Sequence, residues 1–387
     1  MADNTQALMQ RNLAAGAMRI NEQTTPAAVN FSPCGKLVAW LESKNDKATL
    51  RAENRRTGQQ IFSWPLPRPG KNHAAAGLSD KLRTICWSHD SRWLTLTCRW
   101  GAFAADLDSG VLERLPCPAC SVYESCHWAP SVSLLALNQS LSGVQSLLSL
   151  YYTSNSGLQM AQQVTTSQIW GVVWASNSRV LATCGSDDIH ILNTGGQDQL
   201  KLPFPGTDDG GSRVVAWSPN TWDRPHLICI GYSGEAVFVD CEAALKGRCG
   251  NSWQGNHAQA TDVLWGKHGI IALTYQSIWL FDVCSETSGL MLNFRQQISM
   301  PSTHSPVLSP SQVHLCMVKL TPCSSGNLKQ RQIIAILNVI SGSLAHITMP
   351  DYLKSRDKPS WMSSGLSLAV PLVQDEHFLY RIYGFIS

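Results

Sequence analysis

The sequence predicts an all-β chain built from repeats, and two recurring patterns carry that prediction. In the first pattern, a β-branched residue, Leu or Cys and a Trp or Phe stand just before a small polar turn and a short apolar strand, as in VVWASNSRVLAT over residues 172–183. Eight hairpins of this form are predicted, near residues 29–43, 85–98, 126–138, 172–184, 215–231, 263–274, 307–318 and 361–372. Their aromatic position, held by Leu in one copy, is occupied by Phe31, Trp87, Trp128, Trp174, Trp217, Trp265, Leu308 and Trp361.

The second pattern is a turn rich in Asp, Asn and Gly that recurs in phase with the hairpins. It appears at residues 53–58, 106–110, 153–157, 193–196, 240–247, 282–289 and 338–342. Asp and Asn bond to their own backbone in such turns, and Gly supplies the positive φ. Each repeat therefore contains four antiparallel strands in about 40–50 residues, which is one blade of a β-propeller. We expect residues 1–387 to form a single propeller of four-stranded blades.

The number of blades follows from counting the two patterns. Eight inner hairpins are present, but the last repeat ends in FLYRIYGFIS over residues 378–387, a third strand without a fourth. The N-terminal segment 1–24 contains AMRINEQ at residues 17–23, which precedes the first hairpin and could supply the missing strand. Pairing of this kind would remove exposed sheet edges. The count favours eight blades, with seven as the alternative.

The repeats resemble the WD-repeat family of β-propellers over nearly the whole chain. The fourth repeat, VVWASNSRVLATCGSDDIHILNTG over 172–195, carries the resemblance best, and Phe281 with Asp282 occupies the Trp-Asp slot of a later repeat. The sequence departs from the family because no third strand ends in Trp-Asp, and the Gly-His dipeptide is mostly absent, His257 being the nearest match. The resemblance then implies that the family's buried His–Ser–Asp network is broken in most blades, so that apolar packing contributes more.

Composition agrees with a packed repeat protein. Hydrophobic residues make up 44% of the chain and charged residues 15%, and the 14 Trp are far more than usual. The Trp of the repeats are predicted to be core, because each lies at one place in its hairpin beside β-branched neighbours. The Trp outside the pattern suit a surface better, although a core position is the alternative for each; they are Trp64, Trp100, Trp170, Trp222 and Trp253.

Charge and cysteine usage restrict location and ligands. The net charge of +3 gives no argument for direct nucleic-acid binding. Thirteen Cys fall without a regular framework, no secretory signal or transmembrane segment is recognisable, and we expect a cytoplasmic or nuclear protein. Cys117 and Cys120 form a C-x-x-C followed by Cys126 and His127, a spacing that zinc could use. Successive strand residues point to opposite faces, so we favour packing and expect no metal.

The function predicted is a non-enzymatic protein–protein interaction scaffold, a subunit or adaptor of a multiprotein complex. No phosphate-binding loop, nucleophile elbow or zinc-protease motif is present, and no cofactor or small-molecule ligand is expected. Loops at the propeller face would bind the partner protein. The residues predicted to bind it are Arg68, Lys71, Arg83, Arg99, Trp100, Asp187, Asp188, His257 and Lys319. For Asp187 and Asp188, a structural role in the polar loop between the second and third strands is the alternative.

Two other functions stay open at this point. A substrate receptor of a ubiquitin ligase would resemble family members with Arg two residues after Trp-Asp, but Cys284 stands there after Phe281 and Asp282. A propeller-type enzyme would need polar groups that converge at the mouth of the channel. For the basic loop over 65–83, which includes three of the predicted residues, solvated charge without a partner is the alternative.

Overall fold

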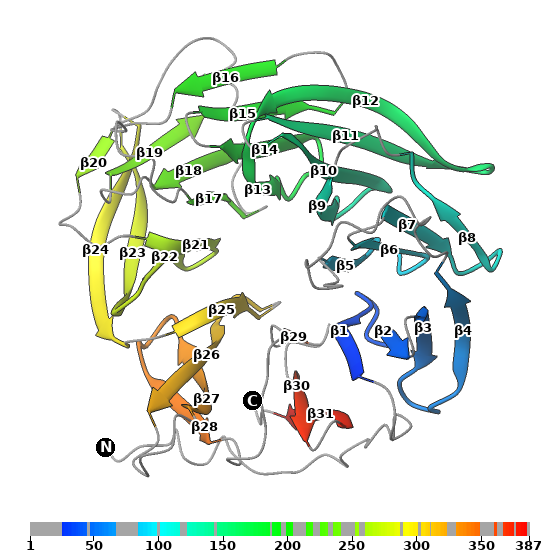
Figure 1. The fold of residues 1–387 in the computed structure, drawn as a ribbon. Coiled ribbons are helices and arrows are strands. Elements are labelled where there is room, and N and C mark those ends of the chain that lie inside the picture. The colour runs from blue at the N-terminus through cyan, green and yellow to red at the C-terminus, as the bar shows by residue number, and fades with distance from the viewer. Residues whose placement is uncertain are drawn as a thin grey trace. The chain divides into compact units, whose positions relative to one another are not determined.

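In the computed structural model, the described residues form eight antiparallel sheets, which follow one another along the sequence (Figure 1). The described residues contain no helix. They group into two compact units, one made of residues 1–126 and 303–387 and the other of residues 127–302. The structure describes residues 25–44, 47–66, 84–98, 101–116, 122–142, 145–185, 188–194, 199–203, 214–219, 225–230, 235–240, 252–254, 260–286, 289–300, 303–309, 311–322, 330–348, 360–361, 367–374 and 377–384.

The first unit contains four sheets, each a meander in sequence order. The first two are β1 (Thr25–Phe31), β2 (Leu37–Lys44), β3 (Lys47–Asn54) and β4 (Gln60–Pro65), then β5 (Thr84–Trp87), β6 (Trp93–Cys98), β7 (Gly101–Asp106) and β8 (Val111–Arg114). The other two are β25 (Thr303–Leu308), β26 (His314–Pro322), β27 (Gln330–Asn338) and β28 (Leu344–Thr348), then β29 (Ser360–Trp361), β30 (Ser367–Gln374) and β31 (His377–Gly384).

The second unit contains four further sheets of the same order, the first of which starts with a strand that crosses the boundary between the units. They are β9 (Val122–Trp128), β10 (Leu134–Ser142), β11 (Gln145–Ser154) and β12 (Gly157–Ser167); and β13 (Ile169–Trp174), β14 (Val180–Gly185), β15 (Asp188–Asn193) and β16 (Gln199–Pro203). The last two are β17 (Val214–Trp217), β18 (His226–Ile230), β19 (Glu235–Asp240) and β20 (Ser252–Gln254), then β21 (Ala260–Gly266), β22 (Gly269–Thr274), β23 (Ser277–Glu286) and β24 (Gly289–Ser299).

A serine directly after the first strand closes the inner hairpin in several sheets. Its Oγ accepts a hydrogen bond from the backbone N–H at the start of the second strand, as in Leu37 N to Ser32 Oγ at 3.0 Å. The same bond joins Trp93 N to Ser88 Oγ, His226 N to Ser218 Oγ and His314 N to Ser309 Oγ. A residue with positive φ stands three positions after three of these serines, namely Gly35, Ser91 and Gln312, and Ser178 stands three positions after Ala175 in the corresponding turn. The small polar turn expected from the sequence is therefore a hydrogen-bonded turn that recurs in several sheets.

The hydrophobic core lies between successive sheets. In the first unit Leu50, Trp87 and Leu96 belong to one buried cluster that joins the first two sheets. In the second unit Ile189 and Trp217 belong to a cluster that joins the β13–β16 and β17–β20 sheets. Face-to-face packing of this kind buries both faces of a strand, and β6 and β7 are accordingly buried along their whole length.

The aromatic residues of the repeats also join neighbouring sheets by hydrogen bonds. In each case the indole Nε1 donates to the carbonyl just before the aromatic residue of the previous hairpin. The pairs are Trp87 to Asn30 O at 3.2 Å, Trp174 to His127 O at 3.0 Å and Trp217 to Val173 O at 3.0 Å. At these three sheet boundaries, the regular spacing of the aromatic residues therefore reflects the same contact.

The prediction of a Trp core agrees with the burial of the described side chains. Phe31, Trp87, Trp128, Trp217 and Trp265 are buried, while Trp174 and Leu308 are half-buried. Of the Trp outside the repeat pattern, Trp170 is exposed and Trp64 is buried. The Trp64 ring stacks on Phe62 with 4.5 Å between ring centroids, and its indole N–H donates to Gly110 O at 3.0 Å. Trp64 thus takes the core alternative. Trp100, Trp222 and the side chain of Trp253 lie outside the described residues.

The last sheet has three strands in the described part of the chain, β29, β30 and β31. The segment 17–23, which was predicted to complete it, lies outside the described residues, so this closure stays a prediction. In the part of the chain that the structure describes, no helix is long and apolar enough to cross a membrane.

Candidate protein-interaction face

Two of the nine residues predicted to bind a partner, Lys319 and Asp188, belong to the described part of the chain. Lys319 is on β26, where its backbone pairs with Thr303 of β25 and Ile333 of β27, and nothing is described of its side chain. Asp188 is the first residue of β15. The others lie outside the described residues and stay predictions, namely Arg68, Lys71, Arg83, Arg99, Trp100, Asp187 and His257.

Asp188 is the centre of a polar cluster within the second unit. Its carboxylate accepts a hydrogen bond from Ser167 Oγ at 2.7 Å and forms an ion pair with Lys201 Nζ at 2.6 Å. His190 Nε2 lies 3.0 Å from the same carboxylate. Burial alone would raise the pKa of Asp188, but the contacts with Lys201 and Ser167 outweigh it and lower that pKa. Burial lowers the pKa of His190, and the neighbouring Asp188 offsets part of that effect.

The cluster serves the sheet, because it joins the end of β12 to β15 and β16. Asp188 is only 3% exposed and its carboxylate is engaged in these contacts, which agrees with the structural alternative for this residue. Gly185 packs against the same place, where an added Cβ would lie 2.5 Å from Gln168 O and 3.0 Å from Ser167 Oγ. The resemblance implied that a His–Ser–Asp network is broken in most blades, and here a serine, an aspartate and a histidine do meet.

An exposed Trp marks the same end of this sheet. The pairing of β13 with β14 skips Trp170, since Ile169 pairs with Gly185 and Gly171 pairs with Cys184. A β-bulge of this kind redirects a side chain out of the ladder, and such bulges are common next to functional sites. Trp170 is 45% exposed, in contrast to the buried Trp217 of the next inner strand. The bulge therefore presents a large aromatic side chain to solvent.

A second aromatic residue lies at the corresponding end of another sheet in the same unit. Tyr275, in the turn between β22 and β23, is 61% exposed. The Thr274 hydroxyl accepts hydrogen bonds from the N–H groups of Gln276 and Ser277, at 3.2 and 3.0 Å, which fixes the turn. The first strand of that sheet also bulges beside the turn, at Thr261.

The topology places these features on one face. In a four-stranded meander, the start of the first strand and the turn between the second and third strands lie at the same end of the sheet. The first strands β13, β17 and β21 contact one another in sequence. We call the ends that carry Trp170, Thr261 and Tyr275 the loop face of the second unit. Large apolar side chains exposed on such a face are candidates for partner contact.

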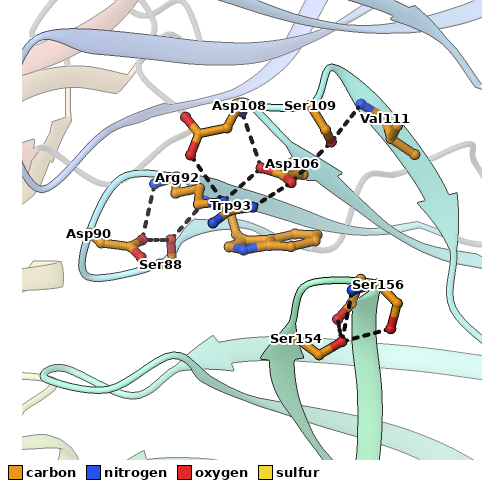
Figure 2. A network of polar contacts seen from close by, with 11 residues as sticks. Ser88, Asp90, Arg92, Trp93, Asp106, Asp108, Ser109, Val111, Ser154 and Ser156 are labelled. Atoms are coloured by element: carbon orange, nitrogen blue, oxygen red, sulfur yellow. Dashed lines mark hydrogen bonds and ion pairs between the residues drawn. The ribbon is translucent and has the colours of Figure 1, made fainter.

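In the first unit, the β5–β8 sheet carries a structural polar network at the end where the β7–β8 turn lies (Figure 2). Arg92 Nε and Nη2 donate to the two carboxylate oxygens of Asp106 at 2.9 and 2.8 Å, and Arg92 also lies 3.2 Å from the exposed Asp108. The contact with Arg92 lowers the pKa of Asp106 to about 2. Asp106 further accepts from Asp108 N and Ser109 Oγ, so it closes the turn between β7 and β8. This is the turn chemistry that the Asx/Gly pattern predicts.

The zinc alternative receives no support from the described residues. Cys117 and Cys120 lie outside them, while Cys126 is buried and His127 is half-buried. Cys126 Sγ lies 3.1 Å from Thr84 Oγ1 and 3.0 Å from Cys86 Sγ. The described part of the chain holds no group of three or more His, Cys, Asp or Glu side chains that could bind a metal.

Solved structures resemble the chain over most of its length. Sqt1 from Chaetomium thermophilum is 13% identical with a TM-score of 0.62, over 95% of this chain and 98% of that chain. The WD40 domain of SCAP from fission yeast is 11% identical with a TM-score of 0.57, over 96% and 98%. A chain in the crystal structure of the mitotic checkpoint complex is 17% identical with a TM-score of 0.51, over 82% and 94%. No protein-family model and no curated protein sequence matches.

The chain has the fold of the WD40 β-propellers. The predicted all-β class and the four-stranded antiparallel sheets are thereby confirmed. The blade number and the strand that closes the propeller stay predictions. At identities of this size the structural similarity shows the fold alone, so the partner has to be argued from the surface of this chain.

The exposed aromatic residues were only partly recognisable in the sequence. Trp170 lies outside the repeat spacing, which set it apart as a surface candidate. Tyr275 gave no such signal, because a tyrosine between apolar strands has the composition of a core strand. Its exposure follows from the shortness of the turn, which places it beyond the last ladder pair, Leu273 with Ile278.

Proposed function

We propose that this propeller is a non-enzymatic scaffold that binds a protein partner through the loop face of its second unit. One observation carries the proposal. The bulge in β13 leaves Trp170 out of the β13–β14 ladder, and its side chain is 45% exposed. Trp and Tyr supply large contact area at a low cost in conformational entropy and are favoured as interface anchors. Tyr275 provides the second anchor on this face.

The support from other proteins is by analogy. A chain of similar fold belongs to the mitotic checkpoint complex, which is an assembly of several proteins. A rigid set of sheets holds connecting loops in fixed positions, and such loops vary without disturbing the core. Subunit or adaptor roles in a complex use this property.

The test is affinity capture followed by binding measurements on the partner identified. Trp170→Ala and Tyr275→Ala should each weaken binding by about tenfold or more, the usual effect of losing an anchor. Val132→Ala is the matched control, since Val132 is also exposed and lies in the β9–β10 turn at the other end of its sheet. Equal affinities for all three variants and the wild type, measured by calorimetry, would remove the loop face from the interface.

A further inference from the structure

Two cysteine thiols of adjacent first strands lie against each other in the first unit. Cys86 is the third residue of β5, and Cys126 is the fifth residue of β9. Their Sγ atoms are 3.0 Å apart, and both residues are thiols in this structure. They stand 40 residues apart in the sequence, so their meeting is a product of the fold.

The surroundings hold the pair in position. Thr84 Oγ1 lies 3.1 Å from Cys126 Sγ and also accepts a hydrogen bond from the backbone N–H of Cys126 at 3.1 Å. The same hydroxyl is 2.8 Å from Thr97 Oγ1. Cys126 is therefore fixed at both its backbone and its side chain by one residue of β5. Side chains held in this way need little reorganisation before they react.

Exposure gives the two thiols different roles. Cys86 is half-buried, whereas Cys126 is only 3% exposed. A small oxidant such as a peroxide therefore meets Cys86 first. A reactive thiol next to a second thiol that resolves it is the usual arrangement of a reversible redox pair.

We propose that Cys86 and Cys126 form a reversible disulfide that ties β5 to β9 under oxidising conditions. Hydrogen peroxide oxidises the Cys86 thiol to a sulfenic acid and is itself reduced to water. Cys126 sulfur then attacks the Cys86 sulfur, the S–S bond forms, and the sulfenic oxygen leaves as water with the Cys126 proton. The sum is two thiols and one peroxide giving one disulfide and two waters. A dithiol reductant reverses the step.

The disulfide would change how firmly the fold holds these strands. Closing a loop of this length restricts the unfolded chain, which raises the stability of the folded form. The segment between the two cysteines, including the connection into β9, would then resist opening. The oxidised protein would therefore open locally less often between β5 and β9 than the reduced protein.

Intact-mass and peptide mapping of the folded, full-length protein test the proposal. After treatment with hydrogen peroxide, we expect the loss of two hydrogen masses, a linked peptide pair containing Cys86 and Cys126, and a melting temperature higher by about 5 °C. Reduction should restore the starting values. Cys86→Ser and Cys126→Ser should each abolish the linkage, and Cys34→Ser, which removes an exposed thiol, should retain it.

Two results would overturn the proposal. One is peroxide treatment that oxidises Cys86 to sulfinic acid without any linked peptide. The other is a linked pair that appears only when the protein is first unfolded in urea. The mapping of the wild-type protein decides both, so the test holds even where a serine variant folds poorly.

Discussion

At the scale of single residues, the polar side chains of this propeller mostly serve its turns. Asp106 is only 6% exposed, yet it is satisfied by the guanidinium of Arg92, the hydroxyl of Ser109 and the N–H of Asp108. The Arg92 side chain is 42% exposed, so the energetic weight of the contact lies with the buried carboxylate, which needs these donors because burial removes it from water. Asp108 also contacts Arg92, but its side chain is 71% exposed and water screens that contact.

The two aspartates of this turn should therefore respond differently to neutralisation. Asp106→Asn should lower the free energy of unfolding by about 1–2 kcal/mol, because it removes a charge-assisted bidentate contact. Asp108→Asn should stay within about 0.5 kcal/mol of the wild type. Urea titrations of both variants measure the difference. Equal losses of unfolding free energy would mean that the contact of Arg92 with Asp106 contributes no more than its contact with Asp108.

The same carboxylate should give a defined pH dependence. Arg92 lowers the pKa of Asp106 to about 2, from an ordinary value of 3.8. Between these values the unfolded chain binds more protons than the folded one, so the stabilisation is complete above pH 3.8 and is lost as the pH falls toward 2. The stability gap between wild type and Asp106→Asn should thus narrow as the pH is lowered from 5 to 3. A constant gap across this range in urea titrations would contradict the assignment.

At the scale of elements, an inner hairpin is joined to the preceding inner hairpin by a hydrogen bond from a Trp indole to a backbone carbonyl at three boundaries. Trp217 Nε1 donates to Val173 O, and the ring also fills the core between two sheets. The sequence predicted the packing from the periodic Trp, because core positions repeat with the strands. It did not predict the hydrogen bond, since the acceptor is a backbone carbonyl that carries no residue signature.

Packing and hydrogen bonding at this contact can be separated by two substitutions. Trp217→Ala should cost about 3–5 kcal/mol through the cavity that it leaves. Trp217→Phe keeps most of the ring and should cost about 1–2 kcal/mol, for the lost bond and a smaller void. Trp170→Ala, at an exposed position, is the control and should change stability by less than about 0.5 kcal/mol. If denaturant titration gave Trp170→Ala a loss as large as that of Trp217→Ala, Trp170 would be part of the core.

At the scale of the whole molecule, the fold was far more predictable than the site. The hairpin pattern recurs eight times and the Asx/Gly turn seven times, so a weak match in one repeat is supported by the others. A binding face is built once, from connecting residues that need not repeat. Asp188 illustrates the difficulty, because the sequence alone left both a partner contact and a structural role open for it, whereas the structure shows its contacts with Lys201 and Ser167.

The closing strand is the last feature that the sequence predicts and that an experiment can decide. The sheet of β29, β30 and β31 has three described strands, whereas each of the other seven described sheets has four, so a fourth strand beside β31 would complete the pattern. If residues 17–23 supply the fourth strand, deletion of residues 1–24 should expose the edge of β31, lower stability by several kcal/mol and cause aggregation. Deletion of residues 1–16 alone retains the proposed strand and should leave the protein monomeric. Size-exclusion chromatography with light scattering compares the oligomeric state of the two truncated proteins, and urea titration compares their stability. A protein lacking residues 1–24 that is monomeric and as stable as the wild type would show that the last sheet does not depend on that segment.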